Sequence, residues 1–364
     1  MMKITFFGAH KSFDYRQVGG MDSLARRLGG ELACMGFDVS FVHFDCPFES
    51  SETTPEGIRL RYFTGFKDSL KYLSGGTQHV ITIYVPPRHR PAWMFYRKLR
   101  GGRTRFHMYY SCWPELWLKR NLGFMEARLC PYNGTLFAAS PRILKHISGW
   151  AKRTSLLLPP VPKAYFVAPG EKKGSDRLRV TFMGRIDPKK GTGEVLALFK
   201  YLAVKAPDIK TLVSGYYWEK DHESVKLHEE LSRQKDISYA PVEFEGYSLE
   251  VEETARRLLR ETDILFLPYD RLSSTVDTPL LLLEGMAHLC IVVTRPLGSM
   301  PDVYGTSEFM LDSLIDHEAC LGLFRQAGTS LIKERKRLAA KCSAIGFKSD
   351  AAAKTLLSSI GDKY

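Results

Sequence analysis

The chain repeats one pattern of strands and helices on both sides of a proline-rich segment. In its first half, an apolar run over 3–8 ends in glycine, and positions from Met21 to Met35 then follow a helical period. In its second half, a strand pattern over 178–183 precedes a helical pattern over 191–205. Strands that alternate with helices in this way favour parallel sheets covered on both faces. The alternation therefore predicts an α/β protein.

The remaining elements follow from the same periodicities. Strands are expected at 37–44, 79–85, 103–109, 134–139, 155–158, 210–214, 242–244, 264–267 and 291–293. Helices are expected at 93–99, 141–147, 250–260 and 280–288, with one long helix over 329–359.

The composition changes at 159–177, where four prolines stand among charged and small residues. We interpret this segment as an interdomain linker, because proline-rich stretches interrupt regular structure. The predicted domains are 1–165 and 166–347, with a C-terminal helix over about 348–364 that packs back on the first domain. Open parallel sheets bind ligands beyond the carboxyl ends of their strands, so two Rossmann-like domains are expected to face a central cleft.

Charge and cysteine usage restrict the location and the partners. There are 52 Lys and Arg against 40 Asp and Glu, and the net charge of +12 favours anionic partners. The seven cysteines form no Cys-x-x-Cys pair, which indicates reduced thiols in a cytoplasmic protein. We expect no signal peptide, no spanning helix, no metal and no nucleic-acid-binding module.

A basic, glycine-containing loop follows the strand expected at 178–183. Gly184, Arg185, Lys190 and Gly191 combine close backbone approach, two cations and the free N–H groups of a helix start, a set that suits a diphosphate. The alternative is a basic turn before a surface helix.

A carboxylate stands within an apolar helix further along the chain. Glu284 lies among leucines, where an unpaired carboxylate is costly and a ribose diol would satisfy it. Asp277 precedes the same helix and is either its N-cap or a ligand residue.

Two further candidates lie in the first half. The N–H groups of Gly19 and Gly20 could hold a phosphate oxygen or a sugar at the start of the first helix. His107 is expected at the end of its strand, on the ligand side, although a lone histidine is more often structural.

As a set, these motifs resemble the retaining GT-B glycosyltransferases of glycosyltransferase family four (glycosyl transferases group 1). The resemblance spans nearly the whole chain. The matching segments are Gly19-Gly20, 24–25, 36–39, 136–140, 158–162, 184–185, 190–191, 244–246, 263–268, 284–287 and 298–303.

The resemblance implies roles for the candidate residues. Arg185 and Lys190 would hold the donor diphosphate together with Gly184, and Glu284 would hold the nucleotide ribose. Gly19 and Gly20 would close on the donor, and His107 would approach the sugar and the reacting phosphate. At the start of the helix that bears Glu284, N–H groups would bind phosphate, and Asp277 would contact donor-sugar hydroxyls one residue after the family's usual glutamate position; the residues at that start are Thr278, Leu280 and Leu281.

The implied reaction is transfer of a sugar, with retained anomeric configuration, from a nucleotide diphosphate sugar, most simply a UDP- or GDP-sugar. The acceptor would be a glycan, a lipid-linked molecule or a small molecule, and no cofactor is required. The first domain would be the acceptor side and the second the nucleotide-sugar side. Two alternatives remain open: a catalytically degenerate scaffold on a membrane surface or partner, and another reaction on this fold, such as a nucleotide-sugar epimerase or a phosphorylase.

A basic segment over 88–105 holds seven Arg and Lys interleaved with three aromatic residues, Trp93, Phe95 and Tyr96. Such a segment suits an anionic membrane surface, which would make the protein peripheral at the inner face of the membrane. The alternative is a solvated helix whose aromatic side chains fill the core.

Overall fold

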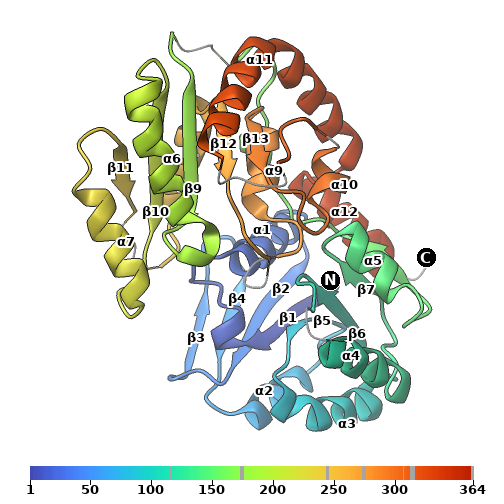
Figure 1. Ribbon diagram of the computed structural model, residues 1–364. Coiled ribbons are helices and arrows are strands. Elements are labelled where there is room, and N and C mark those ends of the chain that lie inside the picture. The colour runs from blue at the N-terminus through green and yellow to red at the C-terminus, as the bar shows by residue number, and fades with distance from the viewer. Residues whose placement is uncertain are drawn as a thin grey trace. The chain divides into compact units, whose positions relative to one another are not determined.

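The computed structural model describes residues 1–114, 117–172, 176–242, 246–272, 276–305, 307–311 and 316–361. The chain divides into two compact units (Figure 1). Unit 1 comprises Met1–Pro162, the short segment around Asp277, and the C-terminal part from Phe347 on. Unit 2 comprises the chain from Lys163, except for the segment around Asp277, and ends at Gly346.

Unit 1 is built on a sheet that, over the described residues, has eight strands in the order β3-β4-β2-β1-β5-β6-β7-β8. Only β3 runs antiparallel to its neighbour, β4. The strands are β1 (Lys3–Ala9), β2 (Asp38–Phe44), β3 (Ser50–Thr53), β4 (Arg59–Tyr62), β5 (His79–Tyr84), β6 (Arg105–Tyr110), β7 (Leu136–Ala138) and β8 (Thr154–Leu156). The helices are α1 (Gly20–Cys34), α2 (Phe66–Leu73), α3 (Arg90–Arg100), α4 (Trp117–Leu129), α5 (Pro141–Ile147) and α12 (Ser349–Ile360), with short 3-10 helices η1 (His10–Ser12) and η2 (Pro87–His89).

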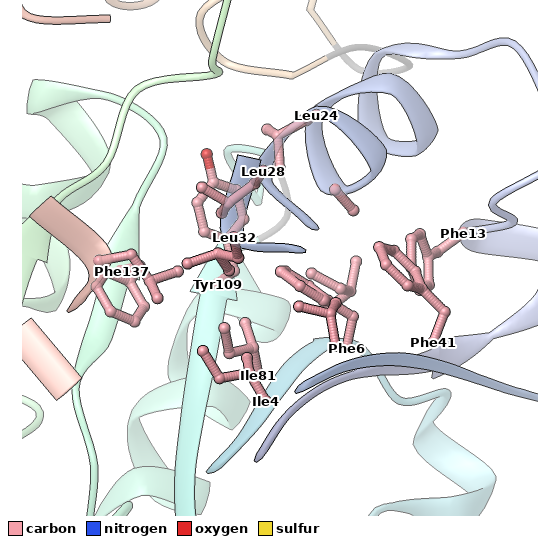
Figure 2. Packing of buried hydrophobic residues seen from close by; sticks show 14 of the residues in the cluster. Ile4, Phe6, Phe13, Leu24, Leu28, Leu32, Phe41, Ile81, Tyr109 and Phe137 are labelled. Carbon is pink, nitrogen blue, oxygen red and sulfur yellow. The ribbon is translucent and has the colours of Figure 1, made fainter. Parts of the chain in front are cut away.

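Alternation along the strands of unit 1 fills a core on each face of the sheet. Phe6 of β1 stacks on Phe41 of β2, with ring centroids 4.8 Å apart, and the leucines of α1 cover this face (Figure 2). Phe7, the next residue of β1, points to the opposite face and stacks on Trp93 of α3. The sheet is therefore covered on both sides, as buried parallel strands require.

Unit 2 has a smaller, fully parallel sheet, whose described strands follow the order β11-β10-β9-β12-β13. Phe266 and its neighbours in the sheet pack against α6 and α11, whereas Leu265 and Val292 face Gly285 of α9 on the other side. The strands are β9 (Arg179–Arg185), β10 (Lys210–Tyr216), β11 (Ser238–Pro241), β12 (Ile264–Leu267) and β13 (Ile291–Thr294). The helices are α6 (Thr192–Lys205), α7 (His222–Ser232), α8 (Leu249–Glu261), α9 (Leu280–Ala287), α10 (Met300–Tyr304) and α11 (His317–Ile345), with η3 (Lys163–Tyr165) and η4 (Pro188–Lys190).

The prediction of an α/β chain with two parallel-sheet domains is confirmed. The single C-terminal helix over 329–359 is wrong, because Gly346 ends α11 in the left-handed conformation at φ +71° and buried Phe347 separates it from α12. The linker is shorter than predicted: the chain leaves unit 1 at Pro162, and Tyr165 is already buried in unit 2. Residues 173–175 of the predicted linker, and Phe244 of the strand expected at 242–244, lie outside the described residues.

Among the described residues, no helix is both long and apolar enough to cross a membrane.

Candidate active site

The basic loop of unit 2 begins inside strand β9, at whose carboxyl end Arg185 stands. Its guanidinium forms an ion pair with Asp187 and lies over the ring of Trp218, 4.5 Å from the ring centre. The Asp187 carboxylate also accepts the N–H of Lys189 at 2.8 Å, so it holds the turn and the arginine together. Arg185 is thus fixed in place and is still part-exposed at 15 %.

Gly191 allows this loop to lie directly against the end of the neighbouring strand, β12. It has φ +77°, and a Cβ atom there would come within 2.1 Å of the Pro268 carbonyl oxygen. The preceding residue, Lys190, is buried, and its ammonium lies 5.0 Å from the ring centre of Tyr269. Two motifs far apart in the sequence therefore meet at the carboxyl ends of β9 and β12.

The start of α9 lies beside the same loop. Leu281 is the neighbour that a Cβ atom on Gly184 would meet, at 3.5 Å. The first N–H groups of a helix have no acceptor within the helix, and here they belong to Leu280 and its neighbours. Thr278, just before the helix, is fully buried, and its hydroxyl has no hydrogen-bond partner among the described residues. A buried hydroxyl without a partner is costly, so this atom fits a ligand oxygen.

Glu284 lies one turn further along α9 and is 5 % exposed. It is close enough to Tyr269 that its charge adds to the effect of burial and raises the pKa of the tyrosine hydroxyl well above its ordinary value. A buried carboxylate thus stands on the helix whose first turn offers N–H groups. The Glu284 carboxylate, which accepts hydrogen bonds, and the N–H groups at the start of α9, which suit an anion, therefore lie about one turn apart.

Asp277 is not the N-cap of α9. The N-cap residue is Pro279, and Asp277 is fully buried within unit 1. The hydroxyl of Ser140 donates to its Oδ2 at 2.5 Å, and the guanidinium of Arg142 forms an ion pair with its Oδ1. The N-cap interpretation of Asp277 is therefore wrong, whereas its contact with the donor sugar stays a prediction; each of its two oxygens has a partner in unit 1.

His107 does not follow its strand, as expected, but is the third residue of β6 and is buried. The N–H of Thr135 donates to its Nδ1 at 2.8 Å, and its Nε2 lies 3.2 Å from Nδ1 of His79. Burial, together with the charge of His79, lowers the pKa of His107 to about 3. Both ring nitrogens are engaged within unit 1, so the expected position on the ligand side is wrong.

Gly19 and Gly20 begin α1, with Gly19 as the N-cap. A Cβ atom on Gly19 would lie 2.3 Å from Oδ2 of Asp22, and one on Gly20 would lie 3.2 Å from a methyl group of Val276. The Asp22 carboxylate accepts the N–H of Asp14 at 2.7 Å, and burial raises the pKa of Asp22 to about 6. A carboxylate therefore already lies at this helix start.

Several side chains that carry or contact charged groups near these positions were not predicted from the sequence. After β1, Nε2 of His10 lies 3.1 Å from the Asp14 carboxylate, which also accepts the Tyr62 hydroxyl at 3.0 Å. Trp218, over whose ring the Arg185 guanidinium lies, was also not identified. The available signal was position after a strand, because His10 follows β1 and Trp218 follows β10. Glu245 of the matching segment 244–246 lies outside the described residues.

The GT-B class of folds has two α/β units with mainly parallel sheets. In such sheets, ligands bind at the loops beyond the carboxyl ends of the strands. Solved structures of this class match over nearly their whole length. An Escherichia coli trehalose-6-phosphate protein bound with UDP-2-fluoro glucose is 11% identical, with a TM-score of 0.69 and coverage of 100% of this chain and 99% of that one. An α,α-trehalose-phosphate synthase (UDP-forming) from Burkholderia vietnamiensis is 11% identical, with a TM-score of 0.66 and 99% of both chains covered.

The catalytic domain of starch synthase IV from Arabidopsis thaliana, bound to ADP and acarbose, is 11% identical, with a TM-score of 0.64 and 98% of both chains covered. At this identity the likeness establishes the fold. Residues 177–319 match the family described as glycosyl transferases group 1, and no curated protein sequence matches the chain. The match covers the basic loop, β12 and α9, and the protein is a glycosyltransferase of the GT-B type.

Proposed function

We propose that the protein is a retaining glycosyltransferase of family four that moves a sugar from a nucleoside diphosphate sugar to an acceptor hydroxyl. The observation that carries this proposal is the convergence in unit 2 of Arg185 and Lys190 with the start of α9. At that helix start stands the hydroxyl of Thr278, for which the described part of the chain offers no hydrogen-bond partner. Two cations, free N–H groups and a buried hydroxyl match the oxygens of a diphosphate.

The chemistry follows from charge development at that diphosphate. The bond between the anomeric carbon and the phosphate oxygen breaks, the acceptor oxygen bonds to the same carbon on the same face, and the departing phosphate takes the acceptor's proton. The diphosphate gains negative charge as it leaves. Fixed cations stabilise that charge without reorganisation, and loss of one such donor typically costs about 2.7–4 kcal/mol of barrier.

Glu284 is proposed to accept hydrogen bonds from the ribose hydroxyls of the donor nucleotide. Its place on α9, about one turn after the helix start, supports this role, because the ribose of a nucleotide lies next to its diphosphate. The base is proposed to be uracil or guanine. The E. coli and Arabidopsis structures contain a UDP-sugar and ADP respectively, which supports a nucleotide donor.

Gly19 and Gly20 are proposed to bind a neutral sugar hydroxyl rather than a phosphate oxygen. The Asp22 carboxylate at the same helix start would repel a second anion, whereas it can accept a hydrogen bond from a hydroxyl. Asp277 is proposed to position Arg142. The acceptor is proposed to be a glycan, a lipid-linked molecule or a small molecule.

The experiment measures release of nucleoside diphosphate from UDP-glucose, GDP-mannose and ADP-glucose, with and without candidate acceptors. Glu284→Gln keeps the shape of the side chain and removes its charge, so we expect KM for the donor to rise by about tenfold. Glu250→Gln, at an exposed position of α8, is the matched control. If no donor is turned over, the proposed reaction fails and a scaffold becomes the better account. If a donor is turned over and Glu284→Gln behaves like Glu250→Gln, the proposed role of Glu284 fails.

A further inference from the structure

Large apolar side chains are exposed on two neighbouring helices of unit 1, α3 and α4. On α3, Phe95 and Leu99 are 65% and 64% exposed, although Trp93 of the same helix is buried in the core. On α4, four more large apolar residues are exposed: Leu122, Phe124, Met125 and Leu129. Exposed apolar residues gathered in this way mark an interaction surface, whereas single ones do not.

The two helices are joined by buried polar contacts and form one surface. The guanidinium of Arg97 donates to the Glu126 carboxylate at 3.2 Å and to the Cys130 carbonyl at 3.0 Å. The Cys130 thiol in turn contacts the Met94 carbonyl at 3.3 Å. Figure 1 shows α3 and α4 beside each other. We call the exposed side of these two helices the α3–α4 surface.

This part of the chain carries most of the net charge. Residues 86–133 contain ten Lys and Arg and two Asp and Glu, a net +8 out of the +12 of the whole sequence. Glu126, one of the two acids, is already paired with Arg97. Lys98, Arg103 and Arg128 are exposed on or next to the two helices. Exposed cations and exposed apolar side chains therefore occur together on these two helices and in the turn after α3.

We propose that the α3–α4 surface docks on an anionic lipid bilayer. The apolar side chains would enter the boundary between headgroups and acyl chains, and the cations would lie at the level of the lipid phosphates. The charge balance decides between this occupant and others. A nucleic acid would use the cations and leave Leu99, Met125 and Leu129 in water, whereas an anionic bilayer uses both kinds of side chain. The proposal is independent of the reaction assigned to unit 2.

The test is co-sedimentation of the full chain with vesicles of phosphatidylcholine alone and of phosphatidylcholine mixed with phosphatidylglycerol. We expect binding to the anionic vesicles only, with affinity that falls as salt is raised. Phe95→Ser combined with Leu99→Ser should weaken binding about tenfold or more. Val204→Ser combined with Ile332→Ser, which removes equally exposed apolar side chains from α6 and α11 in unit 2, should bind as the wild type does.

Charge is tested separately. Lys98→Glu combined with Arg103→Glu should also lower the affinity about tenfold or more. Lys333→Glu combined with Lys336→Glu makes the same change of net charge on exposed positions of α11 and should have a much smaller effect.

The proposal is overturned if anionic vesicles do not bind the protein at low salt, or if the Phe95 and Leu99 variant binds them like the wild type. A gel shift with RNA that depends on the same cations, without vesicle binding, would assign the surface to nucleic acid. All variants change exposed side chains, and unchanged thermal melting confirms that they fold. Because no substituted residue belongs to the proposed donor site, retention of donor turnover in these variants separates failure of docking from failure of the proposed reaction.

Discussion

Arg185 shows how a single charge is held in position for an anion. Asp187 forms an ion pair with its guanidinium, and the guanidinium lies over the ring of Trp218. Sequence alone identifies Arg185, Lys190 and Glu284, because each stands in an unusual local context: a glycine-rich loop or a run of leucines. It does not single out Trp218, which follows β10, because its approach to Arg185 depends on the pairing of β10 with β9.

Replacement of Gly191 by alanine should displace the basic loop. The new Cβ would meet the Pro268 carbonyl oxygen, and φ +77° strains any residue other than glycine. We expect the free energy of unfolding to fall by about 2 kcal/mol or more, measured by urea denaturation. Gly193→Ala, whose Cβ meets nothing within 4 Å in the first turn of α6, should leave stability unchanged or raise it by about 0.5–1 kcal/mol. Equal effects of the two substitutions would contradict the close approach of Gly191 to β12.

His107 should make stability depend on pH in acid. Its folded pKa of about 3 lies below the ordinary value of 6.5, so below pH 6.5 the unfolded chain binds a proton that the folded chain does not. The contribution of neutral His107 to stability is therefore complete above about pH 6.5, and this contribution should fall by about 2–3 kcal/mol between about pH 6.5 and 4.5. Asp22 acts in the opposite direction, because its folded pKa is raised to about 6.

The contribution of His107 is isolated by variant His107→Asn, which retains an acceptor for the Thr135 N–H and cannot be protonated. Its loss of stability between pH 6.5 and 4.5 should be smaller than that of the wild type, whereas exposed His222→Asn should keep the wild-type slope. Identical slopes for His107→Asn and the wild type would show that the buried ring does not cause the acid sensitivity.

At the scale of elements, predictability depends on length and periodicity. β1 and α1 are identified because the strand is almost wholly buried and Leu24, Leu28 and Leu32 share one helical face. β3 is missed because its four residues, Ser-Ser-Glu-Thr, have no apolar alternation and lie at the sheet edge. α2, with eight residues, is too short to show a helical period clearly, and the end of α11 depends on one glycine.

Helix α12 returns the C-terminal part of the chain to the core of unit 1. Leu356, Ala353 and Ile360 are buried in the cluster that contains Phe6 and the leucines of α1. We expect Leu356→Ala to lower the free energy of unfolding by about 2–5 kcal/mol, because it leaves a cavity in that core. Lys354→Ala, on the exposed side of the same helix, should change stability by less than about 0.5 kcal/mol. If Leu356→Ala were as harmless as Lys354→Ala, α12 would not pack on α1.

At the scale of the whole molecule, the chain forms two units, each with a core of its own. The groups that suit a diphosphate all lie in unit 2, and the surface proposed to meet lipid lies in unit 1. The two-unit organisation follows from the sequence because strand–helix alternation occurs twice. The division itself rests on tertiary packing: Asp277 belongs to unit 1 through Ser140 and Arg142, although Thr278 next to it belongs to unit 2.

This division predicts where a bound nucleotide slows hydrogen exchange. Bound UDP or GDP should slow hydrogen exchange in the loop over 184–193 and in the first turn of α9, because the backbone N–H groups of these two segments would contact the diphosphate. The amides of α12 in unit 1 should be unaffected. Protection of α12 without protection of 184–193, measured by mass spectrometry, would place the nucleotide elsewhere.

The most direct test of the central claim is thermal melting with UDP, GDP and ADP on the wild type, Lys190→Ala and Lys189→Ala. Lys190 is buried beside Tyr269, whereas Lys189 is exposed in the same turn and serves as the control. At about 100 times its dissociation constant, a nucleotide adds about 2.7 kcal/mol of stability, which is visible as a higher melting temperature. We predict that one nucleotide stabilises the wild type and Lys189→Ala but not Lys190→Ala. No stabilisation by any nucleotide, or full stabilisation of Lys190→Ala, would contradict the assignment of the diphosphate site.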